Sequence, residues 1–323
     1  MSITIINPKN NYSLSIDGDS LVDIEGNSFP IIDGIPRIAD LDNYTENFGF
    51  QWNKFPLTQL DRENEGLSIS RSRFFAETCW NNEDLSDKNI LEVGSGAGRF
   101  SKVVLENTKA TLYSVDFSDA VNANKKSNGH IAPDRFYLYQ ASIYEMPFLD
   151  NSFDKVFCFG VLQHTPDFDA SVKALINKAM PGGEIVVDFY PIKGWWTKIN
   201  AKYLIRPLTK KMPHEKLLNL IENNIDFLIK LHFTLHSIGL GILARFIPVC
   251  NIKESFPENL TPEEMREWAI LDTFDQYSPE HDHPQRISKV VKMFEKYGAR
   301  VSFAGNVQYG LVGPSCVIRA IKI

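Results

Sequence analysis

The residues best suited to chemistry form a glycine-rich run, Leu91–Arg99 (LEVGSGAGR), at the end of a short apolar stretch. Glycines let a backbone bend sharply and approach a ligand closely, and the start of a following helix offers free N–H groups. Asp116 lies eighteen residues after the last glycine, Gly98. A carboxylate in that place can accept hydrogen bonds from both hydroxyls of a ribose. The pattern indicates a site for a nucleoside-containing ligand; a glycine turn without a ligand is the alternative.

The spacing of the glycines separates two classes of ligand. Dinucleotide-binding loops follow G-x-G-x-x-G, which requires a glycine where this chain has Arg99; its third glycine is Gly98. Glu92, at the end of the apolar stretch, suits an ammonium group and offers nothing to a pyrophosphate. S-adenosyl-L-methionine carries an ammonium and no phosphate. The sequence therefore favours it as the cofactor over a nicotinamide dinucleotide.

Three further motifs follow in order: Met146–Asp154 (MPFLDNSFD), Val161–Asp167 (VLQHTPD) and Met180–Gly183 (MPGG). Together with the glycine run, they make residues 88–190 resemble the class I S-adenosylmethionine-dependent methyltransferases. The resemblance is greatest to the methyltransferase type 11-like group associated with glycan or secondary-metabolite pathways. It implies an α/β, Rossmann-like fold with a seven-stranded, mostly parallel sheet and helices on both faces. It also implies that the chain is a methyltransferase enzyme.

The resemblance further implies which residues bind the cofactor. Glu92 would bind the ammonium, Asp116 would hold the ribose, and Phe117 would lie beside the adenine. Many relatives carry an acid where this chain has Ser142, whose hydroxyl is a weaker acceptor, so this departure bears on cofactor affinity. The implied cofactor-binding residues are Glu92, Gly94, Ser95, Gly96, Gly98, Asp116, Phe117, Ala141, Ser142, Ile143 and Phe159.

His164 is the leading candidate for a catalytic base. It follows the fourth expected strand, at the edge of the sheet where open α/β folds bind ligands, and a base assists methyl transfer to a hydroxyl. Gln163 precedes it and could orient the substrate. The alternative is that His164 caps the helix that begins near Pro166 and only shapes the pocket.

A second polar group lies between Asp272 and His283, and Asp275, Tyr277 and His281 are its candidate catalytic residues. The group could face the substrate, bind a divalent metal or form a solvated loop. Histidine and aspartate suit such metals, but the His-Asp-His order of residues 281–283 is not a specific metal pattern. No metal is therefore predicted.

The alternation of strands and helices gives the elements that would position these residues. Residues 88–190 alternate as expected for a parallel sheet, and residues 284–323 resume that rhythm. Residues 191–283 form a mostly helical insertion after the fifth strand, expected to cap the acceptor site. Residues 41–87 read as leader helices broken at Pro56. Residues 1–40 read as a small β leader that resembles a zinc-ribbon-like element without the cysteines that would hold zinc.

Composition limits the partners. The formal net charge is -6, which argues against a nucleic-acid partner. The four cysteines form no CxxC pair, the N-terminus shows no signal peptide, and the apolar stretch 225–249 is interrupted by charges. A cytoplasmic protein is therefore expected.

The expected acceptor is a small molecule or a glycan, methylated on oxygen. Transfer to nitrogen or carbon of a lipid-like or secondary metabolite, and a non-catalytic methyltransferase-like binding protein, are the alternatives. The basic, aromatic stretch 193–211 could face an anionic acceptor, contact a membrane peripherally, or be an ordinary exposed amphipathic helix. A homodimer through the β leader is a further expectation.

Overall fold

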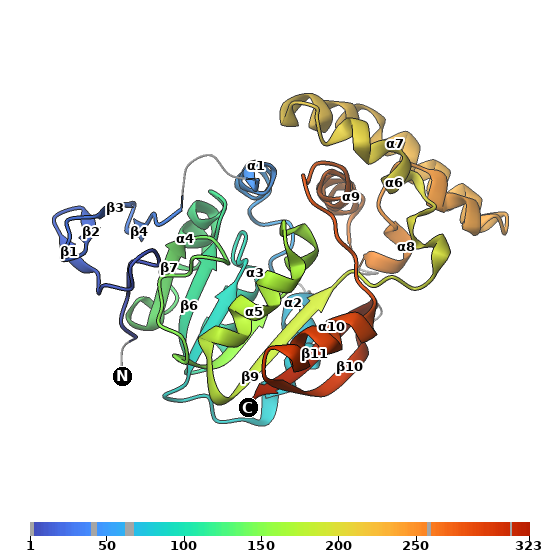
Figure 1. Cartoon of the computed structure of the whole chain (residues 1–323). Helices are drawn as coiled ribbons and strands as arrows, with labels where there is room; N and C mark the ends of the chain where they lie inside the picture. Colours follow the sequence, from blue (N-terminus) through green and yellow to red (C-terminus); the bar gives the residue numbers. More distant parts are fainter. Residues whose placement is uncertain (1–2, 40–43, 62–67, 257–259, 311) are drawn as a thin grey trace.

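The computed structural model describes residues 3–39, 44–61, 68–256, 260–310 and 312–323. Its centre is a seven-stranded sheet in the order β10-β11-β9-β8-β5-β6-β7 (Figure 1). Strands β5 to β9 run parallel, whereas β11 pairs antiparallel with β9 and β10. In chain order the elements of this core are β5 (Asn89–Val93), α3 (Arg99–Asn107), β6 (Thr111–Asp116), α4 (Val121–Asn128), β7 (Phe136–Gln140), β8 (Phe153–Cys158), α5 (Phe168–Lys178), β9 (Ala179–Phe189), α10 (Ile287–Lys296), β10 (Ala299–Tyr309) and β11 (Val312–Lys322).

Helices cover both faces of this sheet, so each face has its own apolar core. Val172 of α5 and Phe294 of α10 are fully buried in the core of one face. Val104 of α3 and Phe74 of helix α2 (Ile69–Thr78) are fully buried in the core of the other. Strands buried on both faces read as continuous apolar runs, which is why NILEV and FDKVFC are recognisable in the sequence. The predicted α/β Rossmann-like fold is confirmed.

The motif Met180–Gly183, whose proline and two glycines favour a turn, lies inside β9. The pairing of β8 with β9 jumps from Phe153–Ala179 to Lys155–Glu184, so the run between them bulges out of the ladder. Gly182 takes a φ of +81° there. The strand thus begins earlier than expected, while the local bend that the glycines predicted is present.

The N-terminal strands form a separate four-stranded antiparallel sheet, β1 (Ser15–Asp17), β2 (Ser20–Val22), β3 (Ser28–Ile32) and β4 (Ile35–Pro36). This sheet covers the β7 edge of the central one. The Arg37 guanidinium donates to Gln140 Oε1 at 2.9 Å, and the backbone N–H of Ile38 donates to Gln140 O at 2.7 Å. Exposed sheet edges invite pairing with other chains, so the leader closes that edge.

A cluster of hydrogen bonds around Asp23 stabilises this leader. Asn7, Asn10 and Asn27 each donate a side-chain N–H to Asp23 Oδ2, at 2.7, 2.8 and 2.9 Å. The amide oxygens of Asn7 and Asn10 accept backbone N–H groups, which fixes their amide nitrogens toward the carboxylate. A cation needs acceptors, whereas these side chains present donors. The residues therefore do not fit a metal, although the leader resembles a zinc-ribbon-like element.

The leader helices are α1 (Glu46–Lys54) and α2, and α1 ends just before Pro56 as predicted. Residues 41–43 and 62–67 of the expected leader segment lie outside the described residues. The insertion contains α6 (Ala201–Thr209), α7 (His214–Ser237), α8 (Ile252–Ser255) and α9 (Pro262–Tyr277), with the 3-10 turns η5 (Trp195–Lys198) and η6 (Gly241–Phe246). These helices share a third apolar core. Among the described residues, no helix is long and apolar enough to cross a membrane.

Figure 1 shows the arrangement that matters for the site. Helices α1 and α9 lie side by side above the ends of the central strands, and α6 and α7 project beyond them, opposite the β leader, while α8 lies against β11. The insertion is therefore a cap over one end of the sheet.

Candidate functional site

The glycine run forms a tight loop between β5 and α3 because two of its glycines leave no room for a side chain. Gly94 has a φ of +82°, and a Cβ built on it would lie 2.1 Å from Val161 Cγ2. Gly98 has a φ of +88°, and its Cβ would lie 2.2 Å from atoms of both Asn124 and Asn128. Only glycine fits such positions. The loop is thus wedged between α4 and the chain that follows β8.

Glu92 lies beneath this loop and outside the wall of the cavity described below. Its Oε2 atom accepts hydrogen bonds from the hydroxyls of Ser101 and Ser114, the latter at 2.7 Å. Asn124 donates to Ser101 at 2.9 Å, and Asn128 donates to the carbonyl of Gly98 at 2.9 Å. Burial raises the pKa of Glu92 to about 7, because a charged carboxylate is costly away from water. The sequence did not single out this polar chain under the loop.

Asp116, at the end of β6, faces the glycine loop. Its Oδ2 atom accepts the backbone N–H of Gly96 at 2.7 Å, and its Oδ1 atom accepts the N–H and hydroxyl of Ser118 at 2.8 and 2.6 Å. Burial raises the pKa of this carboxyl. The loop and the acid thus meet, as the sequence predicted, and Asp116 forms part of the cavity wall.

A single cavity of about 960 Å³ connects this loop with the cap. That is a volume typical of ligand sites. The predicted residues in its wall are Gly94, Ser95, Gly96, Asp116, Phe117, Ala141, Ile143, Phe159, His164, Asp275 and Tyr277. The predicted residues outside its wall are Glu92, Gly98, Ser142, Gln163 and His281.

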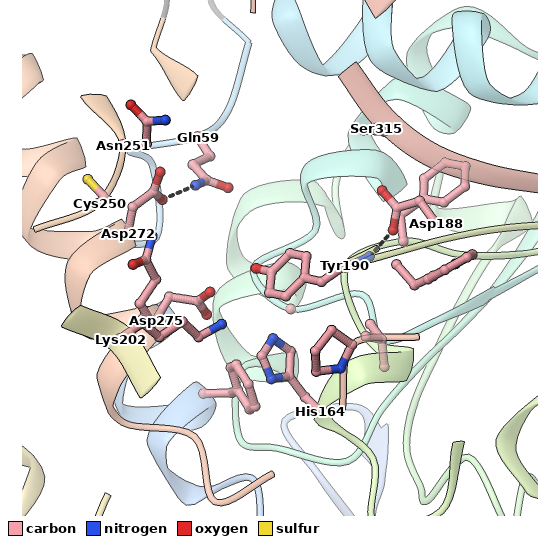
Figure 2. Close-up of a pocket in the computed structure, with 18 of the residues that line it drawn as sticks. Gln59, His164, Asp188, Tyr190, Lys202, Cys250, Asn251, Asp272, Asp275 and Ser315 are labelled. Carbon is pink, nitrogen blue, oxygen red and sulfur yellow. Dashed lines mark hydrogen bonds between the residues drawn. The ribbon is translucent and has the colours of Figure 1, made fainter. Parts of the chain in front are cut away.

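His164, at the end of the 3-10 turn η4 (Leu162–His164), points into the cavity (Figure 2). Its Nδ1 atom lies 3.1 Å from the carbonyl oxygen of His281. A carbonyl can only accept, so the contact requires the proton on Nδ1 and leaves the lone pair on Nε2. Burial lowers the pKa of His164. Phe48 and Tyr190 pack against its ring, with centroids 5.2 and 5.7 Å away.

His281 thus approaches His164 through its backbone and not its side chain. The His281 ring stacks on His283 with centroids 5.6 Å apart and lies edge-on to Tyr44 at 5.4 Å. Among the residues that the structure describes, no cluster of three histidine, cysteine or acidic side chains could hold a metal. The side chain of Gln163 is fully buried, below the cavity wall.

The cap contributes charged side chains to the same space. Figure 2 shows Lys202 of α6 and Asp275 of α9 reaching toward His164 and Tyr190. The Lys202 ammonium lies 3.0 Å from Asp282 Oδ2 and 4.7 Å from the Tyr190 ring centroid. Burial lowers the pKa of Lys202. The sequence offered the 193–211 stretch as one that could face an anionic acceptor, but it did not single out Lys202 as a site residue.

Asp272 lies one helical turn before Asp275 and accepts a hydrogen bond from Gln59 at 3.0 Å. Burial, with Asp275 nearby, raises the pKa of Asp272 to about 7. The cavity therefore holds two carboxyl groups on one face of α9, as expected for residues close to one turn apart. Both can bind hydroxyls or amines of an acceptor.

A buried ion cluster forms a further part of the cavity wall that the sequence did not reveal. Arg73 of α2 donates to Asp188 at the end of β9 and to Glu77 at 2.8 Å, while Asp188 also accepts the N–H of Gly160. Burial raises the pKa of Glu77 to about 7. The cluster ties α2 to the strand ends beside the glycine loop. Arg73 and Glu77 lie four residues apart on α2, but Asp188 is more than a hundred residues away, so no local sequence motif predicts the cluster.

Comparisons with known proteins agree with this geometry. Residues 91–187 match the model of a family described as a methyltransferase domain. A tRNA U34 carboxymethyltransferase of Nautilia profundicola is 33% identical over 112 residues, 34% of this chain and 37% of that protein. A ubiquinone biosynthesis O-methyltransferase of Pseudomonas fluorescens is 27% identical over 134 residues, 39% of this chain and 56% of that protein. The chain thus spans less than two thirds of these relatives.

A solved structure extends the likeness to most of the chain. Magnesium protoporphyrin IX methyltransferase from Synechocystis PCC 6803, crystallised with bound S-adenosylmethionine, superposes with a TM-score of 0.50 and 12% identity. The match covers 88% of this chain and 99% of that one, and at this identity it is one of fold. The resemblance to a methyltransferase domain and the fold expected from the sequence are confirmed. Residues 91–187 match a methyltransferase domain, and the core of the chain has the fold of the class I S-adenosylmethionine-dependent methyltransferases.

Proposed function

We propose that the chain is an S-adenosylmethionine-dependent methyltransferase that methylates an oxygen of a small-molecule or glycan acceptor. The observation that carries this proposal is the shared cavity. The glycine loop and Asp116 form one part of its wall, and His164 with Lys202 and Asp275 forms another. A methyl donor and an acceptor must lie in line in one enclosed space, and this cavity offers that space.

The residues around the loop fit the cofactor. Asp116 can exchange its bond to the Gly96 N–H for bonds to ribose hydroxyls, and Gly94, Ser95 and Gly96 lie in the same part of the cavity wall. When bound, S-adenosylmethionine supplies a methyl group already activated by the positive charge on sulfur. The chain then has to orient the acceptor, exclude water and receive a proton.

His164 is suited to receive that proton. Its Nδ1–H donates to the His281 carbonyl, which orients the ring and leaves Nε2 as the basic atom. Because burial lowers its pKa, the imidazole is neutral at pH 7 and ready to accept a proton from an acceptor hydroxyl. The His281 side chain has no part in this role, since the contact uses its backbone.

The polarity of the acceptor side supports a hydroxyl-bearing acceptor. Asp272, Asp275, Lys202 and Asn200 lie in the cavity wall, and such groups bind hydroxyls by donating and accepting hydrogen bonds. An acceptor that is methylated on carbon or nitrogen inside an aromatic cage would need fewer polar side chains around it. The unpaired cysteines, Cys79, Cys158, Cys250 and Cys316, support a cytoplasmic protein, where thiols stay reduced.

Calorimetry with S-adenosylhomocysteine tests the cofactor site. We expect the wild-type chain to bind it and Asp116→Ala to bind roughly ten- to a hundredfold more weakly, as when charge-assisted hydrogen bonds are lost. Asp134→Ala, an exposed acid of a distant turn, is the matched control and should bind as the wild type does. Equal binding by both variants, with thermal unfolding showing both folded, contradicts the proposed site.

A further inference from the structure

The tip of the cap exposes large apolar side chains. Leu204 and Leu208 lie four residues apart on α6, and so on one face of that helix, with side chains 65% and 74% exposed. Trp195 of η5 and Ile242 of η6 are 80% and 75% exposed. The surfaces of soluble proteins commonly carry isolated exposed apolar residues, whereas a cluster of such residues marks an interaction site.

These elements belong to one surface. Helix α6 contacts η6, and Arg245 of η6 donates to the carbonyl of Trp196 in η5 at 2.7 Å. In Figure 1, α6 and α7 project away from the sheet on the side opposite the β leader. We call η5, α6 and η6 together the cap tip.

The charge of the cap tip is opposite to that of the whole chain. No acidic residue occurs in 189–214 or 227–253, while the formal net charge of the chain is -6. Lys193, Lys198, Lys210 and Lys211 are exposed there. The tip therefore combines aliphatic and indole groups with an excess of exposed lysines.

The cavity reaches this surface. Trp196 and Ile242 are exposed at the tip and also form part of the cavity wall, as does Arg245, while His164 belongs to the wall of the same cavity. A molecule held with its polar end at His164 could thus extend an apolar part to the tip.

An anionic lipid surface fits this combination better than the other occupants. Aliphatic side chains enter the headgroup region, indoles favour the interface, and lysines pair with anionic headgroups while their stems stay apolar. A second copy in a two-fold dimer would bring this positive patch against itself. Single-stranded nucleic acid is bound by stacking on aromatic rings; Trp195 and Trp196 offer such rings, but stacking on them would leave Leu204, Leu208 and Ile242 exposed to water.

We propose that the cap tip docks on an anionic membrane surface, from which the apolar part of the acceptor enters the cavity. The docking stands on the cap tip alone, whereas the entry of the acceptor rests on the proposed methyltransferase function. The acceptor class that follows is a hydroxyl-bearing molecule attached to a lipid.

Vesicle co-sedimentation with the full chain tests the docking. We expect binding to phosphatidylcholine vesicles that contain phosphatidylglycerol, with weaker binding at high salt because screening shortens the reach of surface charges. Leu204→Ser/Leu208→Ser and Lys210→Gln/Lys211→Gln should each weaken binding by roughly tenfold or more. Ile16→Ser/Ile24→Ser, two exposed apolar residues of the β leader, is the matched control and should bind as the wild type does.

The measurements separate this proposal from the enzymatic one. None of the substituted residues lies in the cavity wall, so every variant should bind S-adenosylhomocysteine equally in calorimetry; loss of docking alone then leaves the cofactor site intact. Absence of binding to anionic vesicles overturns the docking, as does equal binding by tip and control variants. A dimer in light scattering that Leu204→Ser/Leu208→Ser dissociates, or retention of RNA without retention on vesicles, also overturns it.

Discussion

At the residue scale, His164 and His281 lie close together in space but have different roles. The lone pair of His164 on Nε2 is available because Nδ1 is committed to the carbonyl of His281. The side chain of His281 stacks on His283 outside the cavity wall.

His164→Gln should lower turnover about a hundredfold or more, the usual contribution of a general base, while the affinity for S-adenosylhomocysteine stays unchanged. His281→Ala, which keeps the carbonyl, should retain turnover and is the matched control. Turnover measured with a responsive acceptor tests both. Turnover of His164→Gln equal to that of the wild type would remove His164 as the base.

The pH dependence follows from the lowered pKa of His164. Turnover should rise with pH through a pKa below 6.5, the ordinary value for histidine, and stay level above it. The unfolded chain protonates this histidine near 6.5 while the folded chain keeps it neutral, so its contribution to stability falls as pH drops through 6.5. A turnover limb centred above 6.5 would contradict the assignment.

At the element scale, the glycines of the loop and of the bulge in β9 carry different constraints. Gly98 and Gly182 have φ angles of +88° and +81°, but a Cβ on Gly98 collides with α4 whereas one on Gly182 meets nothing within 4 Å. The loop is thus held by packing between elements, and the bulge only by its own backbone.

Gly182→Ala should lower the free energy of unfolding by about 1 kcal/mol, the cost of a left-handed conformation for an L-residue. Gly98→Ala should cost about 1–3 kcal/mol more, because Asn124 and Asn128 must move. Urea unfolding of the two variants gives the difference directly. Equal midpoints would mean that the loop is not wedged against α4.

The β leader is stabilised by the hydrogen-bonded cluster around Asp23, so its stability should not depend on a metal. Asp23→Ala removes the acceptor shared by three amides and should lower the thermal midpoint, whereas Asp19→Ala, an exposed acid in the adjacent turn, should not. A chelator should leave the midpoint of the wild-type chain unchanged. A chelator-induced fall would show that a metal holds the leader after all.

At the scale of the whole molecule, the cavity lies between the central sheet and the helical insertion, and both contribute side chains to its wall. The sheet supplies the loop, Asp116 and His164, and the insertion supplies Lys202 and Asp275. The buried pair of Lys202 with Asp282 links α6 to the chain that returns from α9 to the core. Removing one partner of such a pair would leave an uncompensated buried charge, which is strongly destabilising.

Hydrogen exchange should reveal this division. S-adenosylhomocysteine should slow exchange in the glycine loop and around Asp116, Phe117, Ala141 and Ile143, which line the cavity beside that loop. Exchange in the outer turns of α7, which project from the cap, should stay as it is without ligand. Protection confined to α7 would place the ligand in the cap and contradict the site.

The sequence by itself determined the fold class, the glycine loop, Asp116 and His164, because strand alternation and turn chemistry are written in residues close along the chain. It did not determine which of the neighbouring side chains reach the cavity: Glu92 and Gln163 lie outside its wall. That outcome depends on how elements pack, and packing joins residues far apart. Tertiary structure alone brought Lys202 and Asp188 to the site. It also placed the side-chain amides of three asparagines around the Asp23 carboxylate in the β leader. These contacts join residues that are far apart along the chain, which local sequence patterns do not encode.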